Sequence, residues 1–275
     1  MDRQEIKELV KKKYSEIALQ ETETSCCSSG CCSSEVYNIM SEDYSQVEGY
    51  NPDADLGLGC GLPTEFARIE KGDTVVDLGS GAGNDCFVAR AETGEEGRVI
   101  GVDFSPEMIT KAKSNAEKRE FTNVNFRLGD IENMPVGGNF ADVVISNCVL
   151  NLLPLKDKIF KEIFRVLKPG GTFCVSDIVI EGELPQTLRE AAEMYVGCVA
   201  GAIPKNEYMV NIYSAGFSNV KIQKEKMIII PDEILAKYLT EEELEKFKNS
   251  KLKILSITVT GEKSKEGCNC SSGCC

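Results

Sequence analysis

The sequence contains no histidine and no tryptophan among its 275 residues. Without histidine there is no imidazole base, so Ser-His-Asp and Cys-His catalysis are excluded. Metal sites with histidine ligands are excluded for the same reason. Any metal or metalloid site in this chain must therefore be built from carboxylates or from its 13 cysteines.

Positive charge and long apolar runs are also scarce. The chain has 31 basic residues against 44 acidic ones, a net charge of −13, which argues against nucleic acid or an anionic membrane as a partner. No stretch of about 18 apolar residues is present to span a bilayer, and residues 1–14 have no apolar run of the kind found in signal peptides. We therefore expect a cytoplasmic protein, monomeric by default, whose thiols are mostly reduced.

Alternating strand and helix patterns organise the middle of the chain. After an amphipathic helix over 2–20, the apolar patterns predict strands at 74–79, 98–103, 123–130, 141–148 and 171–179. Helices are expected between them, and the last of these, over 156–167, ends at the KPGG of 168–171. This alternation predicts an α/β fold with a doubly wound, mostly parallel sheet.

The pattern changes after residue 180. Helices are expected over 186–199, 205–215 and 232–249, with strands over 221–230 and 253–263, the last one at an edge of the sheet. We divide the chain into an N-terminal helix with a cysteine-rich loop, an α/β core, a C-terminal α+β extension and a flexible cysteine-rich tail, over 1–50, 51–180, 181–263 and 264–275.

A glycine-rich turn follows the first strand of the core. It reads Asp77-Leu78-Gly79-Ser80-Gly81-Ala82-Gly83, and a helix begins directly after it. The glycines allow a tight bend and let a ligand approach the backbone, and the N-terminus of the helix can receive a polar or anionic group. Asp103 ends the next strand, at the position where an acidic residue accepts hydrogen bonds from the ribose hydroxyls of a cofactor in such folds. The turn therefore predicts a nucleotide-like cofactor.

The residues around this turn argue against a dinucleotide. Asn84 stands where the third glycine of that fingerprint is expected, and the Asp77 carboxylate suits an α-amino group better than a pyrophosphate. Asp130 follows Gly129 at the end of the third strand, where it can meet an adenine. This order of motifs, followed by VLKPGG, resembles the class I S-adenosylmethionine-dependent methyltransferases, Rossmann-like enzymes, over about residues 72–180.

The resemblance implies a role for each acidic residue. It places Asp77 near the methionine moiety, Asp103 on the ribose hydroxyls and Asp130 near the adenine. Further contacts with S-adenosylmethionine are implied for the residues at the same strand ends, namely Gly79, Ser80, Gly81, Gly83, Phe104, Gly129, Ile131 and Asn147.

Five cysteines stand alone in the sequence. Cys148 ends the fourth strand, on the side of an open α/β sheet where ligands bind. Cys60 and Cys198 each adjoin glycines, as a close approach to a ligand requires. Cys86, in a helix, and Cys174, within a strand, are interpreted as ordinary buried residues.

The surroundings of these cysteines carry a second resemblance. The strings GLGCGLPT, SNCVLNL and MYVGCVAGA, together with DLGSGAGNDCF and GVDFSPEMI, resemble the arsenite S-adenosylmethionine methyltransferases over about residues 45–260. In that family three such cysteines bind trivalent arsenic, which implies this role for Cys60, Cys148 and Cys198. Thiolates suit so soft a centre. The implied reaction converts arsenite or methylarsenite into methylated arsenicals and S-adenosylhomocysteine.

The N-terminal cysteine cluster is expected to serve thiol turnover. Methylation oxidises arsenic formally, so thiols must return it to the trivalent state, and thioredoxin or glutathione must then reduce the resulting disulfide. The family resemblance implies that one upstream cysteine pairs with Cys60; the sequence does not choose among Cys26, Cys27, Cys31 and Cys32. The C-terminal cluster, Cys268, Cys270, Cys274 and Cys275, is open between arsenite capture, binding of stray soft metals and no catalytic role.

Two other interpretations compete with arsenite methylation. The core motifs alone also fit a methyltransferase of a small organic or quinone substrate, against which the three single cysteines argue. A thiol-rich metal-binding protein with an inactive core is the other alternative, and the complete set of Asp77, Asp103 and Asp130 argues against it.

Overall fold

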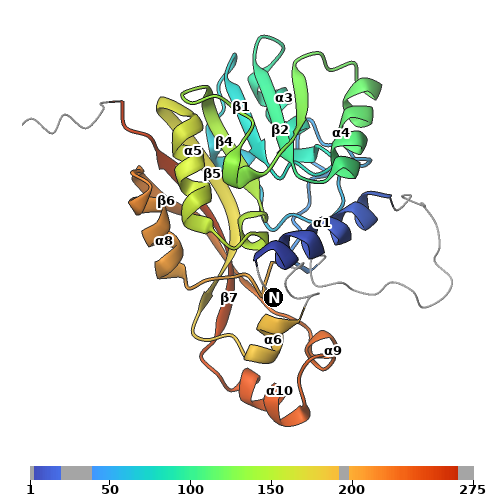
Figure 1. Ribbon diagram of the computed structural model, residues 1–275, viewed down its shortest axis with the longest axis vertical. Helices are drawn as coiled ribbons and strands as arrows, with labels where there is room; N and C mark the ends of the chain where they lie inside the picture. The colour runs from blue at the N-terminus through green and yellow to red at the C-terminus, as the bar shows by residue number, and fades with distance from the viewer. Residues whose placement is uncertain (1–2, 20–38, 192–197, 266–275) are drawn as a thin grey trace, which may run out of the picture.

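The computed structural model describes residues 3–19, 39–191 and 198–265 (Figure 1). Its strands are β1 (Thr74–Leu78), β2 (Arg98–Asp103), β3 (Val124–Leu128), β4 (Ala141–Asn147), β5 (Leu167–Glu181), β6 (Ser218–Ile228) and β7 (Lys253–Glu262). Its helices are α1 (Arg3–Leu19), α2 (Thr64–Ala67), α3 (Asn84–Thr93), α4 (Pro106–Lys118), α5 (Lys156–Val166), α6 (Gln186–Glu190), α8 (Lys205–Ser214), α9 (Asp232–Leu235) and α10 (Glu241–Lys248), with 3-10 turns η2 (Ile131–Asn133) and η3 (Leu150–Leu152).

The described strands form one seven-stranded sheet in the order β3-β2-β1-β4-β5-β7-β6. Strands β1 to β5 pair in parallel, while β7 runs antiparallel to β5 and β6 antiparallel to β7. The chain order reverses between β1 and β4, which creates the crevice at the carboxyl ends of the strands where open α/β sheets bind ligands. The doubly wound, mostly parallel sheet predicted from the sequence is confirmed.

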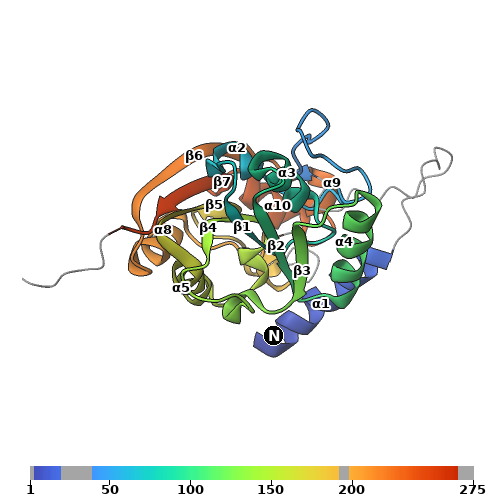
Figure 2. The same cartoon turned by 90° about the horizontal axis from the view of Figure 1, so that it is seen from above.

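Alternate residues of the parallel strands pack against helices on opposite faces of the sheet. Val76 and Val144 join the apolar cluster that contains α5 and α8 residues, whereas Val75 and Val143 join the cluster that contains α3 and α4 residues. Seen from above, α5 and α8 lie on one side of the sheet, with α2 and α3 on the other (Figure 2). The strands are therefore buried on both faces, as their continuous apolar runs predict.

The C-terminal part of the chain differs from two of the sequence predictions. The strand over 253–263 is not at the edge, because β7 lies between β5 and β6. Seven of the ten residues of β7 are buried, whereas one of the eleven residues of β6 is buried. The predicted acidic helix over 232–249 is two helices, α9 and α10. The chain restarts at Thr240, whose hydroxyl and the Glu243 carboxylate form a capping box, a strong helix-start signal.

The ends of two predicted helices also differ from the sequence predictions. Helix α5 ends at Val166, and β5 begins at once with Leu167, so the KPGG lies within the strand. The helix expected over 186–199 is described only as α6, which ends at Glu190, and part of the remainder lies outside the described residues. The eight clustered cysteines also lie outside them.

Helix α1 lies against α4 near one end of the sheet (Figure 1). The Lys7 ammonium donates to the Asp130 carboxylate over 2.6 Å and to the Glu132 carboxylate over 2.7 Å. The Ser15 hydroxyl donates to the Glu107 carboxylate over 2.5 Å. These contacts fasten α1 beside the crevice. Although burial acts in the opposite direction, the hydrogen bonds to the two carboxylates raise the pKa of Lys7.

Loss of the Lys7 contacts is expected to destabilise the fold. Glu132 is only 5% exposed, so Lys7→Met leaves a buried carboxylate without its cation, and we expect a loss of about 1–3 kcal/mol in the free energy of unfolding. Urea unfolding followed by circular dichroism measures it. Lys12→Met, at an exposed position of the same helix, is the control, and equal stability of both variants would contradict the expectation.

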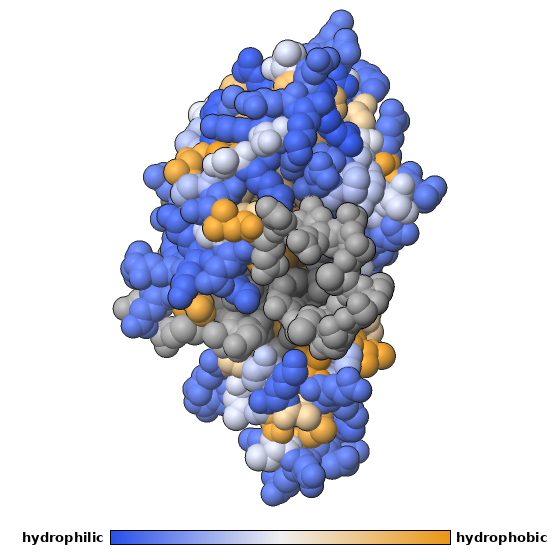
Figure 3. Space-filling view, turned by 90° about the vertical axis from the view of Figure 1, so that its right-hand side faces the viewer, coloured by the Kyte–Doolittle hydropathy of each residue, from blue (hydrophilic) through white to orange (hydrophobic). Residues whose placement is uncertain are grey.

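The upper part of the face in Figure 3 is mostly hydrophilic, in keeping with the excess of charged residues in the sequence. Among the helices of the described ranges, none has the length and apolar composition needed to cross a membrane.

Candidate active site

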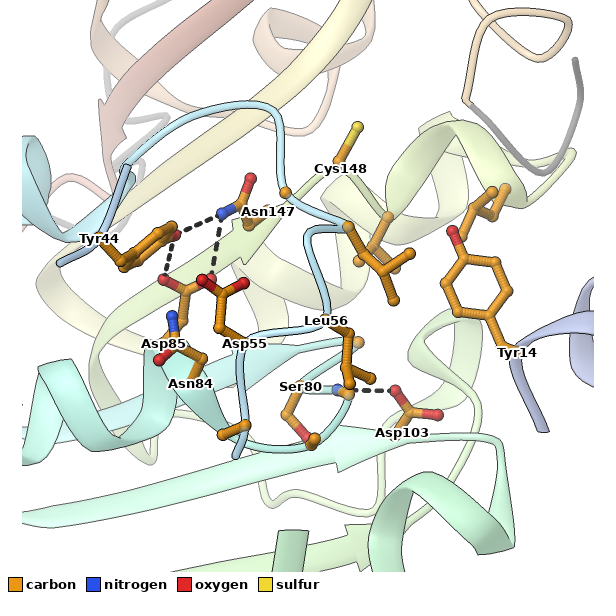
Figure 4. Close-up of a pocket in the computed structure, with 18 of the residues that line it drawn as sticks. Tyr14, Tyr44, Asp55, Leu56, Ser80, Asn84, Asp85, Asp103, Asn147 and Cys148 are labelled. Atoms are coloured by element: carbon orange, nitrogen blue, oxygen red, sulfur yellow. Dashed lines mark hydrogen bonds between the residues drawn. The ribbon is translucent and has the colours of Figure 1, made fainter. Parts of the chain in front are cut away.

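A pocket of about 700 Å³ opens at the carboxyl ends of β1, β2 and β4 (Figure 4). Tyr14 and Asp103 lie at one end of it, and Tyr44, Asp85 and Asn147 lie together at the other. The volume and the mixture of apolar walls with a few convergent polar groups are typical of a site for a small organic ligand.

The glycine-rich turn forms one wall of the pocket. Gly79 and Gly81 have φ values of 65° and 51°, which only glycine adopts without strain. A Cβ at Gly79 would lie 2.5 Å from the Val149 side chain. The Gly81 amide donates to the Asp103 carboxylate over 3.0 Å, so the turn and the acid at the end of β2 hold each other in place.

The carboxylates around the pocket are poorly solvated. Burial raises the pKa of Asp103 to about 6, although backbone amides of Ser105, Gly81 and Phe104 oppose the shift. Burial likewise raises the pKa of Asp85 to about 6, against hydrogen bonds from Tyr44 and Asn147. Asp77, 2% exposed, lies beneath the turn, and burial raises its pKa well above the ordinary value. A cationic ligand would relieve the cost of these charges.

Cys86 contributes more than apolar volume. Its thiol donates to the Asp77 carboxylate over 3.2 Å, so it is a polar partner of the acid next to the last residue of β1. Cys174 is buried among apolar residues of the α3 side of the sheet, as predicted.

The three cysteines singled out by the sequence come together next to the pocket. Cys60, Cys148 and Cys198 are 1%, 4% and 2% exposed and belong to one apolar cluster. Side-chain hydrogen bonds join Cys148 to both of the others, and the Cys198 thiol also donates to the Cys148 carbonyl over 2.9 Å. Cys148 in addition lines the pocket, so it connects the two sites.

Two of these cysteines have a strained backbone. Cys148 and Cys198 have φ values of 58° and 62°, the left-handed region that residues with a Cβ rarely adopt. The Cys148 amide donates to the Ser176 carbonyl over 2.7 Å, which holds the turn after β4. Such strain persists where surrounding structure enforces it and is concentrated at functional sites.

The surroundings of the three thiols favour neutral groups. Burial raises the pKa of Cys60, and it raises that of Cys148 well above the ordinary value with additional effect from its cysteine neighbours. Burial also raises the pKa of Asp177 to about 7 and lowers that of Lys156. Within the described ranges no three cysteine or carboxylate side chains are arranged so that they could hold a metal ion. Of the three thiols, Cys148 is the one that contacts both of the others.

Comparison with known proteins identifies the family. A family model described as "Methyltransferase domain" matches residues 69–216. The arsenite methyltransferase of Halobacterium salinarum is 40% identical over 80% of this chain, and the human one 33% identical over 53%. The crystal structure of an arsenic(III) S-adenosylmethionine methyltransferase from Chlamydomonas reinhardtii is 34% identical, covers 75% of this chain and 68% of its own, and has a TM-score of 0.64.

This chain belongs to the arsenic(III) S-adenosylmethionine methyltransferase family. It spans 59% of the length of the Halobacterium relative and 41% of the human one. The family recognised from the sequence motifs is therefore confirmed.

The methyltransferase pocket contains about half of the cofactor residues predicted from the sequence. Those that line it are Gly79, Ser80, Gly81, Asp103, Phe104 and Asn147. Those that do not are Asp77, Gly83, Gly129, Asp130 and Ile131. Asp130 instead pairs with Lys7 of α1.

Sequence reasoning missed several residues of this methyltransferase pocket. Tyr14, Tyr44, Asp55 and Asp85 also line it. Asp85 could have been found from its place in the first turn after the glycines. No local signal marks Tyr14, because α1 reaches the pocket only through the tertiary fold.

Proposed function

We propose that this protein transfers the methyl group of S-adenosylmethionine to trivalent arsenic held by Cys60, Cys148 and Cys198. The observation that carries the proposal is the meeting of three buried thiols at the wall of a pocket built for a nucleotide-like ligand. Cys148 belongs to both sites, so a group bound by the thiols is held next to a group bound in the pocket.

The pocket residues fit S-adenosylmethionine. The Ser80 hydroxyl is buried and has no hydrogen-bond partner among the described residues, and Asp103 offers a carboxylate to the ribose hydroxyls. The negative charges of the Asp55 and Asp85 carboxylates would stabilise the positive charge of S-adenosylmethionine. When bound, S-adenosylmethionine supplies an electrophilic methyl group on a sulfonium to the arsenic lone pair.

The thiols can load arsenite without any base. Three S–H groups react with As(OH)₃ to form three As–S bonds and three waters, so each thiol proton leaves on a departing hydroxyl. The product is neutral, and an apolar cluster in which burial raises the pKa values of Cys60 and Cys148 tolerates a neutral complex far better than an anionic one. Arsenic keeps a lone pair, so no proton has to be removed before methylation, and positioning is the protein's main contribution.

Turnover then requires electrons. Forming the As–CH₃ bond with the arsenic lone pair raises arsenic formally from the trivalent to the pentavalent state. Two thiols can reduce arsenic back to the trivalent state by forming one disulfide. Thioredoxin or glutathione in a reducing compartment such as the cytoplasm would then reduce that disulfide. We propose Cys60 with one of Cys26, Cys27, Cys31 and Cys32 as that pair; the four lie outside the described residues.

One assay tests the proposed function. The full-length protein is incubated with arsenite, glutathione and S-adenosylmethionine carrying a labelled methyl group, and methylated arsenicals are separated by chromatography with arsenic detection. Labelled methylarsenicals are the expected product. S-adenosylmethionine binding without any methylated arsenic would refute the proposal and favour another methyl acceptor, and absence of binding would favour an inactive core.

Cofactor affinity is expected to depend on pH through Asp103. Because its pKa is raised to about 6, the carboxylate that accepts from the ribose becomes protonated as pH falls through 6, and affinity should fall by up to about tenfold per pH unit below that point. Isothermal titration of S-adenosylhomocysteine from pH 5 to 8 measures this. Asp103→Asn should bind more weakly with a shallower pH dependence, the remainder arising from Asp85, whose pKa is also about 6. An unchanged slope in that variant would contradict the assignment.

A further inference from the structure

The side chain of Asn147 connects the methyltransferase pocket with the loop that carries Cys60. Its Oδ1 accepts a hydrogen bond from the Cys60 amide over 3.0 Å, and its Nδ2 donates to the Gly61 carbonyl over 2.8 Å. The Cys60 N–H and the Gly61 carbonyl are therefore both hydrogen-bonded to Asn147, the last residue of β4. The next residue along the chain is Cys148, so one amide sets the spacing of two of the three thiols.

Two neighbours keep this amide in one orientation. The Tyr44 hydroxyl lies 2.7 Å and the Asp85 carboxylate 3.1 Å from the same Nδ2, so its two hydrogens are shared among three acceptors, the third being the Gly61 carbonyl. The Tyr44 hydroxyl donates to the other Asp85 oxygen over 2.6 Å. Rotating the Asn147 amide by half a turn would face its oxygen towards a carboxylate and a carbonyl, and its NH₂ group towards the Cys60 N–H. The partners therefore determine which end of the amide meets Cys60.

Two further side chains hold the Cys60 loop, and one of them is Tyr44, whose hydroxyl lies 3.2 Å from the Gly61 carbonyl. The loop lies between α2 and the N-terminal helix without regular structure of its own, so side chains must supply its hydrogen bonds. From the opposite side the Ser256 hydroxyl donates to the Cys60 carbonyl over 2.5 Å. A Cβ at Gly59 would lie 2.6 Å from Asn147 Nδ2, so the backbone passes directly against the amide.

We propose that Tyr44, Asp85 and Asn147 form a positioning network that holds Cys60 against Cys148 for the capture of trivalent arsenic, and that it does so whether or not the methyl donor is bound. The inference rests on the proposed function. Tyr44, Asp85 and Asn147 lie together at one end of the pocket in Figure 4, with dashed lines between them. Three thiols can bind one arsenic atom only when all three sulfurs lie close together. Conformational freedom of the Cys60 loop therefore lowers the affinity for arsenite, because that freedom is lost on binding.

Arsenite affinity of the cofactor-free protein tests the network, because any direct contact of these residues with the donor is then irrelevant. The full-length chain is used with the clustered cysteines, Cys26, Cys27, Cys31, Cys32, Cys268, Cys270, Cys274 and Cys275, replaced by serine, so that arsenic–thiolate absorbance reports the remaining thiols. Asn147→Asp keeps an acceptor for the Cys60 amide but faces Asp85 and the Gly61 carbonyl with a carboxylate. We expect it to bind arsenite about tenfold more weakly.

A second substitution provides the rescue. Asp85→Asn alone leaves a side chain that can still accept from Asn147, and we expect arsenite affinity within about threefold of the parent. Combined with Asn147→Asp it exchanges the amide and the carboxylate, so a donor again faces residue 147. The carboxylate at 147 still faces the Gly61 carbonyl, so part of the lost affinity should return. Tyr44→Phe, which removes one hydroxyl, should weaken binding by about threefold, and Tyr213→Phe, on an exposed face of α8, is its control.

The outcomes separate the two proposals. A parent that binds no arsenite through Cys60, Cys148 and Cys198 overturns both the proposed function and this network. A parent that binds, with Asn147→Asp and Tyr44→Phe folded by circular dichroism and unchanged in affinity, overturns the network alone. A double variant that binds arsenite no more tightly than Asn147→Asp also overturns it. Such a result would indicate a general packing defect, which exchanging the amide and the carboxylate does not repair.

Discussion

Cys148→Ser is expected to abolish arsenite methylation, with a fall in rate of at least about a hundredfold, while S-adenosylhomocysteine affinity changes by less than about twofold. Serine keeps the size of the side chain and its short reach from a backbone at φ 58°. It replaces a soft sulfur by a hard oxygen, which is a poor ligand for trivalent arsenic. Because Cys148 contacts both of the other thiols, its loss removes the sulfur that the other two share.

The cofactor half of this prediction follows from the layout of the pocket. The Gly81 amide and the Asp103 carboxylate hold each other independently of Cys148, so nucleotide binding does not need the thiol. Initial rates of methylarsenical formation and isothermal titration measure the two halves separately. Cys174→Ser, in a buried strand outside the thiol cluster, serves as the matched control and should retain activity. Full activity of Cys148→Ser would refute the three-thiol site.

The sequence predicted those parts of the site that depend on neighbours along the chain. The glycine turn and Asp103 lie where the strand–turn–helix pattern puts them, because consecutive parallel strands bring their carboxyl ends to one edge. Cys148 follows from the same rule, because it is the first residue after β4. Family motifs, rather than spacing, singled out Cys60 and Cys198, which the fold brings to Cys148 from distant segments.

Contacts between distant segments were not predictable in the same way. Asp130 has the sequence context of a cofactor ligand, yet its carboxylate meets Lys7, 123 residues away. The partners of Asn147 come from the Cys60 loop, from α3 and from Tyr44, which is separated from it by 103 residues. The order of β7 and β6 was hidden for a related reason: both are alternating strands, and only burial on both faces distinguishes an inner strand from an edge.

Arsenite binding is expected to be nearly independent of pH between about 6 and 8, whereas zinc binding to the same thiols should strengthen steeply as pH rises. Loading As(OH)₃ converts three S–H groups and three hydroxyls into three As–S bonds and three waters, so no proton is released. Zinc binds only thiolates, and each thiol proton must then leave to solvent, which makes the affinity rise by about tenfold per pH unit for each proton released.

The buried position of the thiols enlarges this difference. Burial raises the pKa values of Cys60 and Cys148, so expelling their protons for zinc is disfavoured at neutral pH, and three thiolates around a divalent ion would leave a net negative charge in an apolar cluster. The neutral arsenic complex avoids both costs. Calorimetric titration in two buffers of different ionisation enthalpy counts the protons directly, using the chain with serine at the clustered cysteines. Release of one or more protons per arsenite would contradict the neutral complex, and tight zinc binding at pH 6 would favour a thiol-based metal store over a site selective for trivalent arsenic.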